Sequence, residues 1–263
     1  MSCLTGSAQS KIAPSIFHDM QYFYDLHLHS CLSPCADNDM TPNNIAGMLS
    51  LSGIGLAALT DHNTCKNCPA FFEAAARYGV IPVPGMELTT SEEIHVVCLF
   101  PGLSEAMAFD GFVSERRMKL PNRTEIFGDQ LITDGEDNVT GTDPYFLPAA
   151  TGISVDEVPG LVEGYGGVSY PAHVDRESGG IIAILGTFPD IPGFCSAEFH
   201  DRSKQNEYFE RYPLLKSKRI LISSDAHNLW GIRDKEAFLE LDEGGDDDVR
   251  RALIGMLKTD KSV

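Results

Sequence analysis

No run of apolar residues in this 263-residue chain approaches the length that crosses a lipid bilayer. Residues 1–20 also lack the basic start and apolar block that mark a secretory signal. Both absences favour a cytoplasmic protein with no membrane partner. The hydrophobic fraction of 43% and the charged fraction of 22% are ordinary for a globular protein. The sequence does not indicate an oligomeric state.

Basic residues are scarce. The chain has 20 Lys and Arg and 38 Asp and Glu, which gives a formal net charge of −18. Proteins that bind nucleic-acid backbones gain most of their affinity from Lys and Arg, so this balance argues against nucleic acid as a partner. Residues 116–123 form the one concentrated positive stretch. Such a stretch either meets an anion or forms a solvated helix face that pairs with nearby acids, and the sequence leaves both open.

A disulfide framework is not expected, because seven cysteines is an odd number and a chain of this length does not need covalent staples. Cys65 and Cys68 could form half of a structural zinc site or a redox pair. No second cysteine pair of suitable spacing follows them, so ordinary reduced thiols at the start of a helix are the favoured interpretation.

Short apolar runs alternate with helical patterns along most of the chain, which is typical of an α/β barrel formed by one domain, residues 1–263. Thr41 followed by Pro42 predicts a helix start, and Gly53 and Gly79 close the first two helices. The predicted helices are 41–52, 70–78 and 246–257. The predicted strands are 22–28, 56–60, 80–83, 95–100, 166–173, 193–199 and 219–227.

Residues 103–162 depart from this alternation and mix charges, prolines and isolated apolar residues. We interpret them as one or two helices plus an insertion that lies as a lid over one mouth of the barrel. The run at 95–100 follows a short polar turn after the preceding strand, and that spacing predicts a hairpin-like neighbour instead of a helical crossover.

Histidines and acids recur where the predicted strands end or begin. His27 and His29 are two residues apart, so on a strand both imidazoles would leave the same face. In barrels of alternating strand and helix, the loops at the carboxyl ends of the strands gather into one active site. The other residues in such positions are Asp61, His62, Glu87, His95, His173, Asp225 and His227.

Imidazoles mixed with carboxylates and without thiolates suit Zn, Mn or Fe in a site that keeps positions open for water and substrate. More than four ligands implies more than one ion. Two ions a few ångströms apart can clamp a phosphoryl group and lower the pKa of a bridging water. The inventory therefore favours hydrolysis of a phosphate ester, with amide or lactone hydrolysis next.

The ordered combination of these motifs, over residues 22–233, resembles the PHP superfamily of polymerase and histidinol phosphatase domains. The stretch 122–130 is similar to one found in stand-alone bacterial members of this family. The resemblance implies a distorted (β/α)7 TIM-like barrel, a centre of two or three divalent ions and phosphoesterase activity. The motifs are His27-Leu28-His29, Thr60-Asp61-His62-Asn63, Gly85-Met86-Glu87, His95, Pro171-Ala172-His173 and Ser224-Asp225-Ala226-His227.

The resemblance also assigns ligands. It implies a first ion held by His27, His29, Glu87 and Asp225. It implies a second ion held by Glu87, His95 and His173. It implies a third ion held by His62, His227 and a residue of the first loop, where the family often has histidine and this chain offers Asp37 or, two residues on, Asp39.

Further residues are candidates for catalysis around the ions. Asp61 would orient a ligand or handle a proton. Arg176, three residues after His173, and Arg123, from the insertion, are the candidates for binding phosphate. His200 follows a predicted strand and is a candidate general acid, although an ordinary loop histidine is the simpler interpretation. Arg116 and Lys119 are weaker phosphate candidates.

The first hypothesis is therefore a metal-dependent phosphoesterase that hydrolyses a small phosphorylated metabolite, such as a nucleotide or sugar phosphate, through a metal-activated hydroxide. The insertion would act as a lid that supplies Arg123. One alternative is a 3′-5′ exonuclease-like phosphodiesterase acting on nucleic-acid ends. Another is a barrel that binds metal without catalysis.

Overall fold

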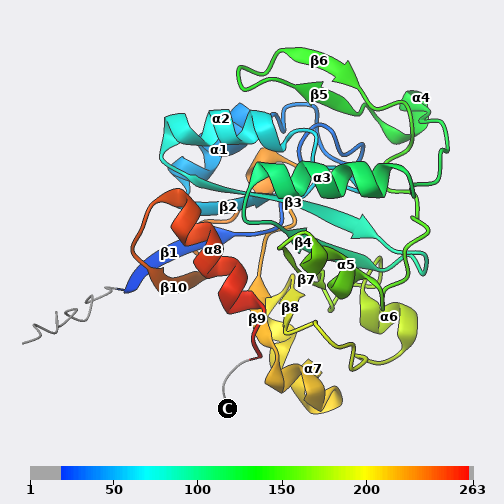
Figure 1. Ribbon diagram of the computed structural model, residues 1–263, viewed down its shortest axis with the longest axis vertical. Helices are drawn as coiled ribbons and strands as arrows, with labels where there is room; N and C mark the ends of the chain where they lie inside the picture. Colours follow the sequence, from blue (N-terminus) through cyan, green and yellow to red (C-terminus); the bar gives the residue numbers. More distant parts are fainter. Residues whose placement is uncertain (1–18, 261–263) are drawn as a thin grey trace, which may run out of the picture.

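The computed structural model describes residues 19–260, and all seven predicted strands are present in it (Figure 1). A hairpin inside the predicted insertion and a late strand were not predicted. The predicted strands are β1 (Asp19–Asp25), β2 (Leu56–Leu59), β3 (Ile81–Thr89), β4 (His95–Leu99), β7 (Val168–Pro171), β8 (Ser196–Phe199) and β9 (Arg219–Ile222). The additional strands are β5 (Leu131–Thr133), β6 (Val139–Thr142) and β10 (Phe238–Asp242).

The three predicted helices are confirmed as α1 (Pro42–Leu51), α2 (Cys68–Tyr78) and α8 (Asp246–Leu257). The Thr41 side chain accepts a hydrogen bond from the Asn44 N–H, and Gly79 ends α2 in the left-handed conformation. Between residues 19 and 260, no helix has both the length and the apolar character needed to cross a membrane. The other helices are α3 (Leu103–Ser114), α4 (Thr124–Phe127), α5 (Val158–Gly164), α6 (Ile181–Leu185), α7 (Gln205–Arg211) and the 3₁₀ turns η1 (Arg202–Lys204), η2 (Pro213–Ser217) and η3 (Leu229–Gly231).

The strands form a curled six-stranded sheet in the order β10-β1-β2-β3-β4-β7 and a separate two-stranded sheet, β8-β9. Strands β1, β2 and β3 are parallel, whereas β4 is antiparallel to both of its neighbours and β10 is antiparallel to β1. A hairpin-like β4 was predicted, and the short turn after Thr89 explains it because a parallel crossover needs a dozen or more residues. The sheet is thus a half-barrel, and a closed (β/α)7 barrel is not confirmed.

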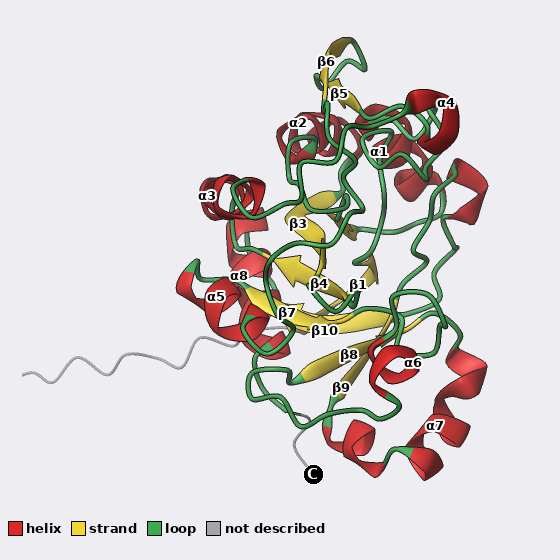
Figure 2. Ribbon diagram, turned by 90° about the vertical axis from the view of Figure 1, so that its right-hand side faces the viewer, coloured by secondary structure: helices red, strands yellow, loops and turns green. Residues whose placement is uncertain are grey.

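The β8-β9 pair lies beside β7 and β10 in Figure 2, and backbone hydrogen bonds join it to the larger sheet just beyond the ends of β7 and β1. The Val174 N–H donates to the Glu198 carbonyl at 2.8 Å, and the His29 N–H donates to the Ala226 carbonyl at 3.1 Å. A parallel bridge pairs Leu28 with Ala226. The seam between the two sheets therefore passes through the segments that carry the predicted metal ligands.

The predicted insertion begins and ends in helices of the core, because Phe109 of α3 and Val162 of α5 are fully buried. The residues between these helices, 115–157, include α4 and the β5-β6 hairpin at the top of Figure 1. We call residues 115–157 the lid segment. The Asn63 side-chain amide donates to the Leu147 carbonyl at 2.7 Å and ties this segment to the loop after β2.

Cys65 and Cys68 lie in the hydrophobic core at the start of α2. Their thiols lie 3.2 and 3.5 Å from the Gly85 carbonyl oxygen, and burial raises the pKa of the Cys65 thiol well above its ordinary value. These contacts agree with ordinary protonated thiols.

Candidate metal centre

The first two histidines converge on acids from distant parts of the chain. His27 and His29 follow β1 and are fully buried. The Nε2 atom of His27 lies 3.2 Å from Nε2 of His29, 3.3 Å from a carboxylate oxygen of Glu87 and 3.4 Å from a carboxylate oxygen of Asp225. Four electron-pair donors from three strands thus face one another, which is the arrangement that a cation occupies.

Glu87, near the carboxyl end of β3, gathers three further histidines. Its carboxylate oxygens lie 2.9 Å from Nδ1 of His62, 2.8 Å from Nδ1 of His95 and 3.0 Å from Nε2 of His173. Because both oxygens are engaged from several sides, Glu87 is placed to join two neighbouring ligand groups.

His227 completes the cluster by stacking on His29, with the ring centroids 4.3 Å apart. The structure therefore brings eight of the nine predicted metal residues into contact. Within this cluster three groups offer ligand atoms that all lie within 4.8 Å of one another. They are His27-His29-Asp225, His62-Glu87-His95 and His29-His62-His227.

Asp37, the ninth predicted ligand, lies outside these groups. It is exposed, and its backbone N–H donates to the His227 carbonyl at 2.8 Å. Cys35, two residues earlier, is also an exposed residue, and burial of its thiol together with the charge of Glu87 raises the pKa of this thiol to about 12.

The charges of the centre match what a divalent ion requires. Burial lowers the pKa of His62 to about 4 and that of His227 to about 3. Burial also works to lower the pKa of His29, but its hydrogen bonds to Asp225 and Glu87 outweigh burial and raise it to about 9. Glu87 is buried, yet the surrounding histidines hold its pKa well below its usual range. Metals bind ionised carboxylates and neutral imidazoles, so Glu87, His62 and His227 already have the required form, whereas His29 must release a proton when an ion binds.

Two acids orient the histidines from behind. Glu198, the third residue of β8, accepts from the His27 Nδ1–H at 2.8 Å and from the His173 N–H at 3.1 Å. A carboxylate behind a histidine fixes the ring and its tautomer. Glu198 was not predicted, and its one signal in the sequence is an acid near the end of a strand, two residues before His200.

Asp61 acts on His29 through a serine. Its carboxylate accepts from the Ser30 N–H and the Ser33 hydroxyl, both at 2.7 Å, and the Ser33 Oγ lies 3.0 Å from Nδ1 of His29. These contacts favour the orienting role among the two considered for Asp61.

The backbone adopts uncommon conformations at the ligands. His173 has a φ of 23° and Asp225 a φ of 50°, values that residues other than glycine rarely adopt. Gly179 has a φ of 68°, and a Cβ atom there would lie 2.6 Å from the His95 ring. Local strain and a glycine therefore help to aim the ligands.

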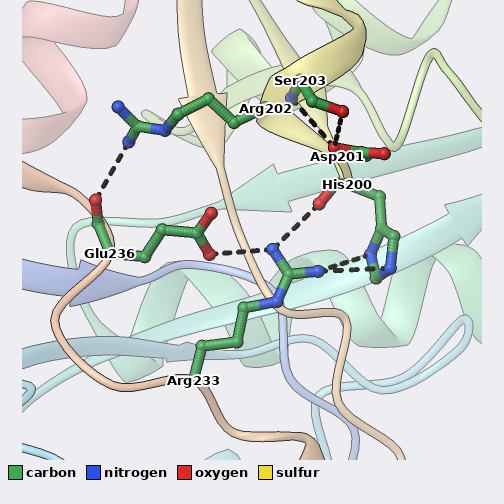
Figure 3. A pocket seen from close by; sticks show the side chains of 6 residues that line it. All are labelled: His200, Asp201, Arg202, Ser203, Arg233 and Glu236. Atoms are coloured by element: carbon green, nitrogen blue, oxygen red, sulfur yellow. Dashed lines mark hydrogen bonds and ion pairs between the residues drawn. The ribbon is translucent and has the colours of Figure 1, made fainter.

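Two arginines flank His200 beside the metal ligands. Arg176 forms an ion pair with Asp225, and its Nη2 lies 3.1 Å from Nδ1 of His200. On the other side, Arg233 places Nη2 3.2 Å from Nε2 of His200 and donates from Nη1 to the His200 carbonyl (Figure 3). Burial and these two cations lower the pKa of His200. Arg233 was not predicted, because nothing in its local sequence distinguishes it from a surface arginine.

The basic stretch of the lid segment lies elsewhere. Arg123 is exposed, with its guanidinium carbon 5.9 Å from the centroid of the Phe127 ring. Arg116 is exposed and packs over Phe112. In the described contacts, none of these arginines reaches the metal ligands.

Comparison with known proteins agrees with the residues of this centre. The model of the PHP domain matches residues 25–138, a range that contains His27, His29, His62, Glu87 and His95. The 5′-3′ exoribonuclease Rnm of Salmonella typhimurium is 29% identical over 113 residues, which are 41% of this chain and 37% of the exoribonuclease.

Solved structures share the fold at lower identity. A lesion-specific endonuclease Q from Pyrococcus furiosus superimposes with a TM-score of 0.63 and 18% identity, over 90% of this chain and 56% of the endonuclease. An amidohydrolase from Chromobacterium violaceum with bound sulfate gives a TM-score of 0.52 and 20% identity, over 83% of this chain and 98% of that protein. The chain thus spans about half of the endonuclease and less than half of the exoribonuclease.

Proposed function

From the match of residues 25–138 to the PHP domain, we propose that this chain is a metal-dependent phosphoesterase. The observation that carries the proposal is the convergence of eight imidazole and carboxylate side chains from both sheets in one cluster, with Arg176 beside it. Bound divalent ions would polarise phosphoryl oxygens and lower the pKa of a bound water. Zn, Mn and Fe are the candidate ions.

The residues around the cluster have separate proposed roles. Arg176 contacts Asp225 and would hold a phosphate oxygen with the guanidinium N–H groups that Asp225 leaves free. His200 is the proposed proton donor to the leaving oxygen, because a bound phosphate would offset the two guanidinium charges that lower its pKa. Arg123 is proposed to reach the substrate only through movement of the lid segment.

Space for the substrate lies next to these groups. A cavity of about 570 Å³ adjoins His200 and Arg233 (Figure 3). Its walls also contain Arg202, and the Arg202 guanidinium donates to the Glu236 carbonyl at 3.0 Å. The wall also contains Asp201 and Glu236 and none of the metal ligands, so a small phosphorylated metabolite, the first candidate substrate, would reach the ions past His200.

A nucleic-acid end is the second candidate substrate. The names of an exoribonuclease and an endonuclease among the similar proteins favour it, so the net charge of −18 is not sufficient to set nucleic acid aside. The net charge averages over the whole surface, whereas Arg176 and Arg233 concentrate positive charge beside the predicted metals.

The test is release of phosphate from a panel of monoesters, nucleotides and short oligonucleotides by protein stripped with a chelator and reloaded with Mn, Zn or Fe. We expect turnover only after reloading. Glu87→Gln should lower the rate about 1,000-fold, because the ions supply several kcal/mol of transition-state stabilisation and each 1.4 kcal/mol is a factor of ten.

The matched control is Glu210→Gln, which removes an exposed acid of α7 and should keep the wild-type rate. Elemental analysis of the same samples distinguishes the enzyme from a barrel that only binds metal. Protein that contains metal but cleaves no monoester or diester would refute the proposed activity.

A further inference from the structure

A second cavity, of about 170 Å³, lies between the lid segment and the loop after β2, apart from the metal ligands. Three cationic side chains and one carboxylate line it, so two positive charges remain in excess in a protein whose net charge is −18. The lining residues are Lys66, Ser114, Arg117, Lys119, Asp143, Pro144 and Tyr145.

Asp143 is the single acid of this cavity, and it is already fully paired. One carboxylate oxygen lies 2.6 Å from the Lys66 ammonium and 3.0 Å from Nη2 of Arg117, and the other accepts from the Tyr145 N–H at 3.0 Å. Burial works to raise the pKa of Asp143, but these partners outweigh it and hold the pKa below its usual value. The carboxylate is thus ionised and offsets one cation, and the other two have no acid in the cavity wall.

Arg117 carries the clearest sign of a missing partner. Its side chain is only 6% exposed, and among the described residues its Nε and Nη1 atoms are buried without a hydrogen-bond acceptor. Leaving a buried polar group of this kind unpaired costs about 1–3 kcal/mol, so such atoms usually have a water or an ion as a partner. Arginine N–H groups match the oxygens of phosphate and sulfate, and the excess of positive charge favours an anion over water.

The cavity joins the loop that carries His62 to the lid segment. Lys66 follows His62 by four residues in the loop after β2, whereas Arg117, Lys119 and Asp143 belong to the lid segment. We propose that this cavity binds a phosphate-class oxyanion, which fastens the lid segment to the loop that carries His62. The site would bind free phosphate or the phosphate group of a nucleotide. Arg117 and Lys119, which line it, belong to the basic stretch at 116–123 that the sequence singled out.

The test uses the full chain after removal of metal by a chelator, so that turnover plays no part and an inactive protein can still support the proposal. Inorganic phosphate is titrated by calorimetry and by thermal unfolding, with chloride at equal ionic strength as the reference. We expect saturable binding and a rise in Tm. Adenosine monophosphate in a parallel titration distinguishes the sources, since equal affinity indicates phosphate alone and higher affinity indicates a nucleotide.

Variants locate the bound anion. Lys119→Gln removes an exposed cation without touching the pair with Asp143, and Arg117→Lys keeps the charge but removes the unpaired N–H groups. Each should weaken binding about tenfold, as expected for a hydrogen bond to a charged group. Lys216→Gln, in the η2 turn, is the surface control and should bind as the wild type does.

Arg176→Gln tests the competing location at the metal centre. Binding that survives Arg176→Gln and falls in the Lys119 and Arg117 variants supports the proposal. Binding that is lost in Arg176→Gln and unchanged in the other two overturns it, and so does the absence of saturable binding of both probes.

Discussion

Glu87 lies within β3, which is hydrogen-bonded to strands on both sides, whereas Asp225 follows β9 in the two-stranded sheet that stands apart. The first half of the metal centre is therefore fixed by the register of a six-stranded sheet. The second half depends on loops, on a positive φ at Asp225 and on contacts across the seam. His27 joins the halves, since its ring contacts Glu87 on one side and Glu198 on the other.

Because Glu87 and Asp225 come from different sheets, a bound ion that contacts both would act as a cross-link between the sheets. Acids and imidazoles on the two sides converge, yet few backbone hydrogen bonds hold the sides together. One polar link without metal is Asp25, whose carboxylate accepts from the Ser224 N–H at 3.1 Å. Another is the Tyr24 hydroxyl, which accepts from the Ile222 N–H at 3.1 Å.

Removal of the metal should therefore lower the stability of the protein more than any substitution does, and it should affect the two-stranded sheet more than the six-stranded sheet. A bound ion present at 100–1,000 times its Kd stabilises the folded state by about 3–4 kcal/mol. In a chain of this size, its removal corresponds to a fall in Tm of roughly 10 °C. Hydrogen exchange followed by mass spectrometry should show faster exchange in β8 and β9 after chelation, with little change in β2 and β3. Equal acceleration in both sheets would contradict the cross-link.

Replacing Glu198 should give the next largest effect, because this carboxylate orients His27 and also belongs to the smaller sheet. Loss of an orienting carboxylate costs about 10–100-fold in metal affinity or activity, so we expect Glu198→Gln to weaken metal binding by that factor. It should also speed exchange in β8 and β9.

Asp61→Asn provides the matched comparison on the other side of the seam. It removes the acid that orients His29 through Ser33, so it should weaken metal binding to a similar degree. Exchange in β8 and β9 should stay as in the wild type at equal metal occupancy. Identical exchange profiles for the two variants would remove the distinction between the two halves.

The sequence was most informative where ligands stand at strand ends. The spacing of His27 and His29 after an apolar run, and the placement of Glu87 and Asp225 after others, were sufficient to predict that they meet. Parallel strands with loops at one edge impose that meeting whatever the loops contain. The seven strands follow from the same periodicity.

Residues whose positions depend on loop geometry were harder to predict from the sequence. The exposed position of Asp37 depends on the path of a loop that no periodic pattern describes. Glu198 and Arg233 act through partners far away in the sequence, so the local sequence gives at most a weak signal for Glu198 and none for Arg233. The open edge between β7 and β8 likewise reflects packing between distant segments.

The smallest effect concerns protons, and it differs between ligands of the same centre. The pKa of His29 is about 9 in the metal-free protein, so His29 carries a proton at pH 7, whereas His62, with a pKa of about 4, is already neutral. Metals bind the neutral imidazole. The acids Glu198, Asp225 and Glu87 outweigh burial and also hold the pKa of His27 well above its ordinary value. Binding at pH 7 should therefore displace protons from His29 and His27, and the apparent affinity should rise with pH by at least about tenfold per unit up to about pH 9.

Calorimetry in buffers of different ionisation enthalpy measures this release directly. Asp225→Asn removes one of the two acids that hydrogen-bond His29 and raise its pKa, so His29 would hold its proton less firmly and fewer protons would be released at pH 7. His62→Ala removes an imidazole that is already neutral, so the release per ion bound should stay near the wild-type value. A release that is independent of Asp225 would show that the titrating proton does not come from a histidine paired with this carboxylate, and the assignment to His29 would then be wrong.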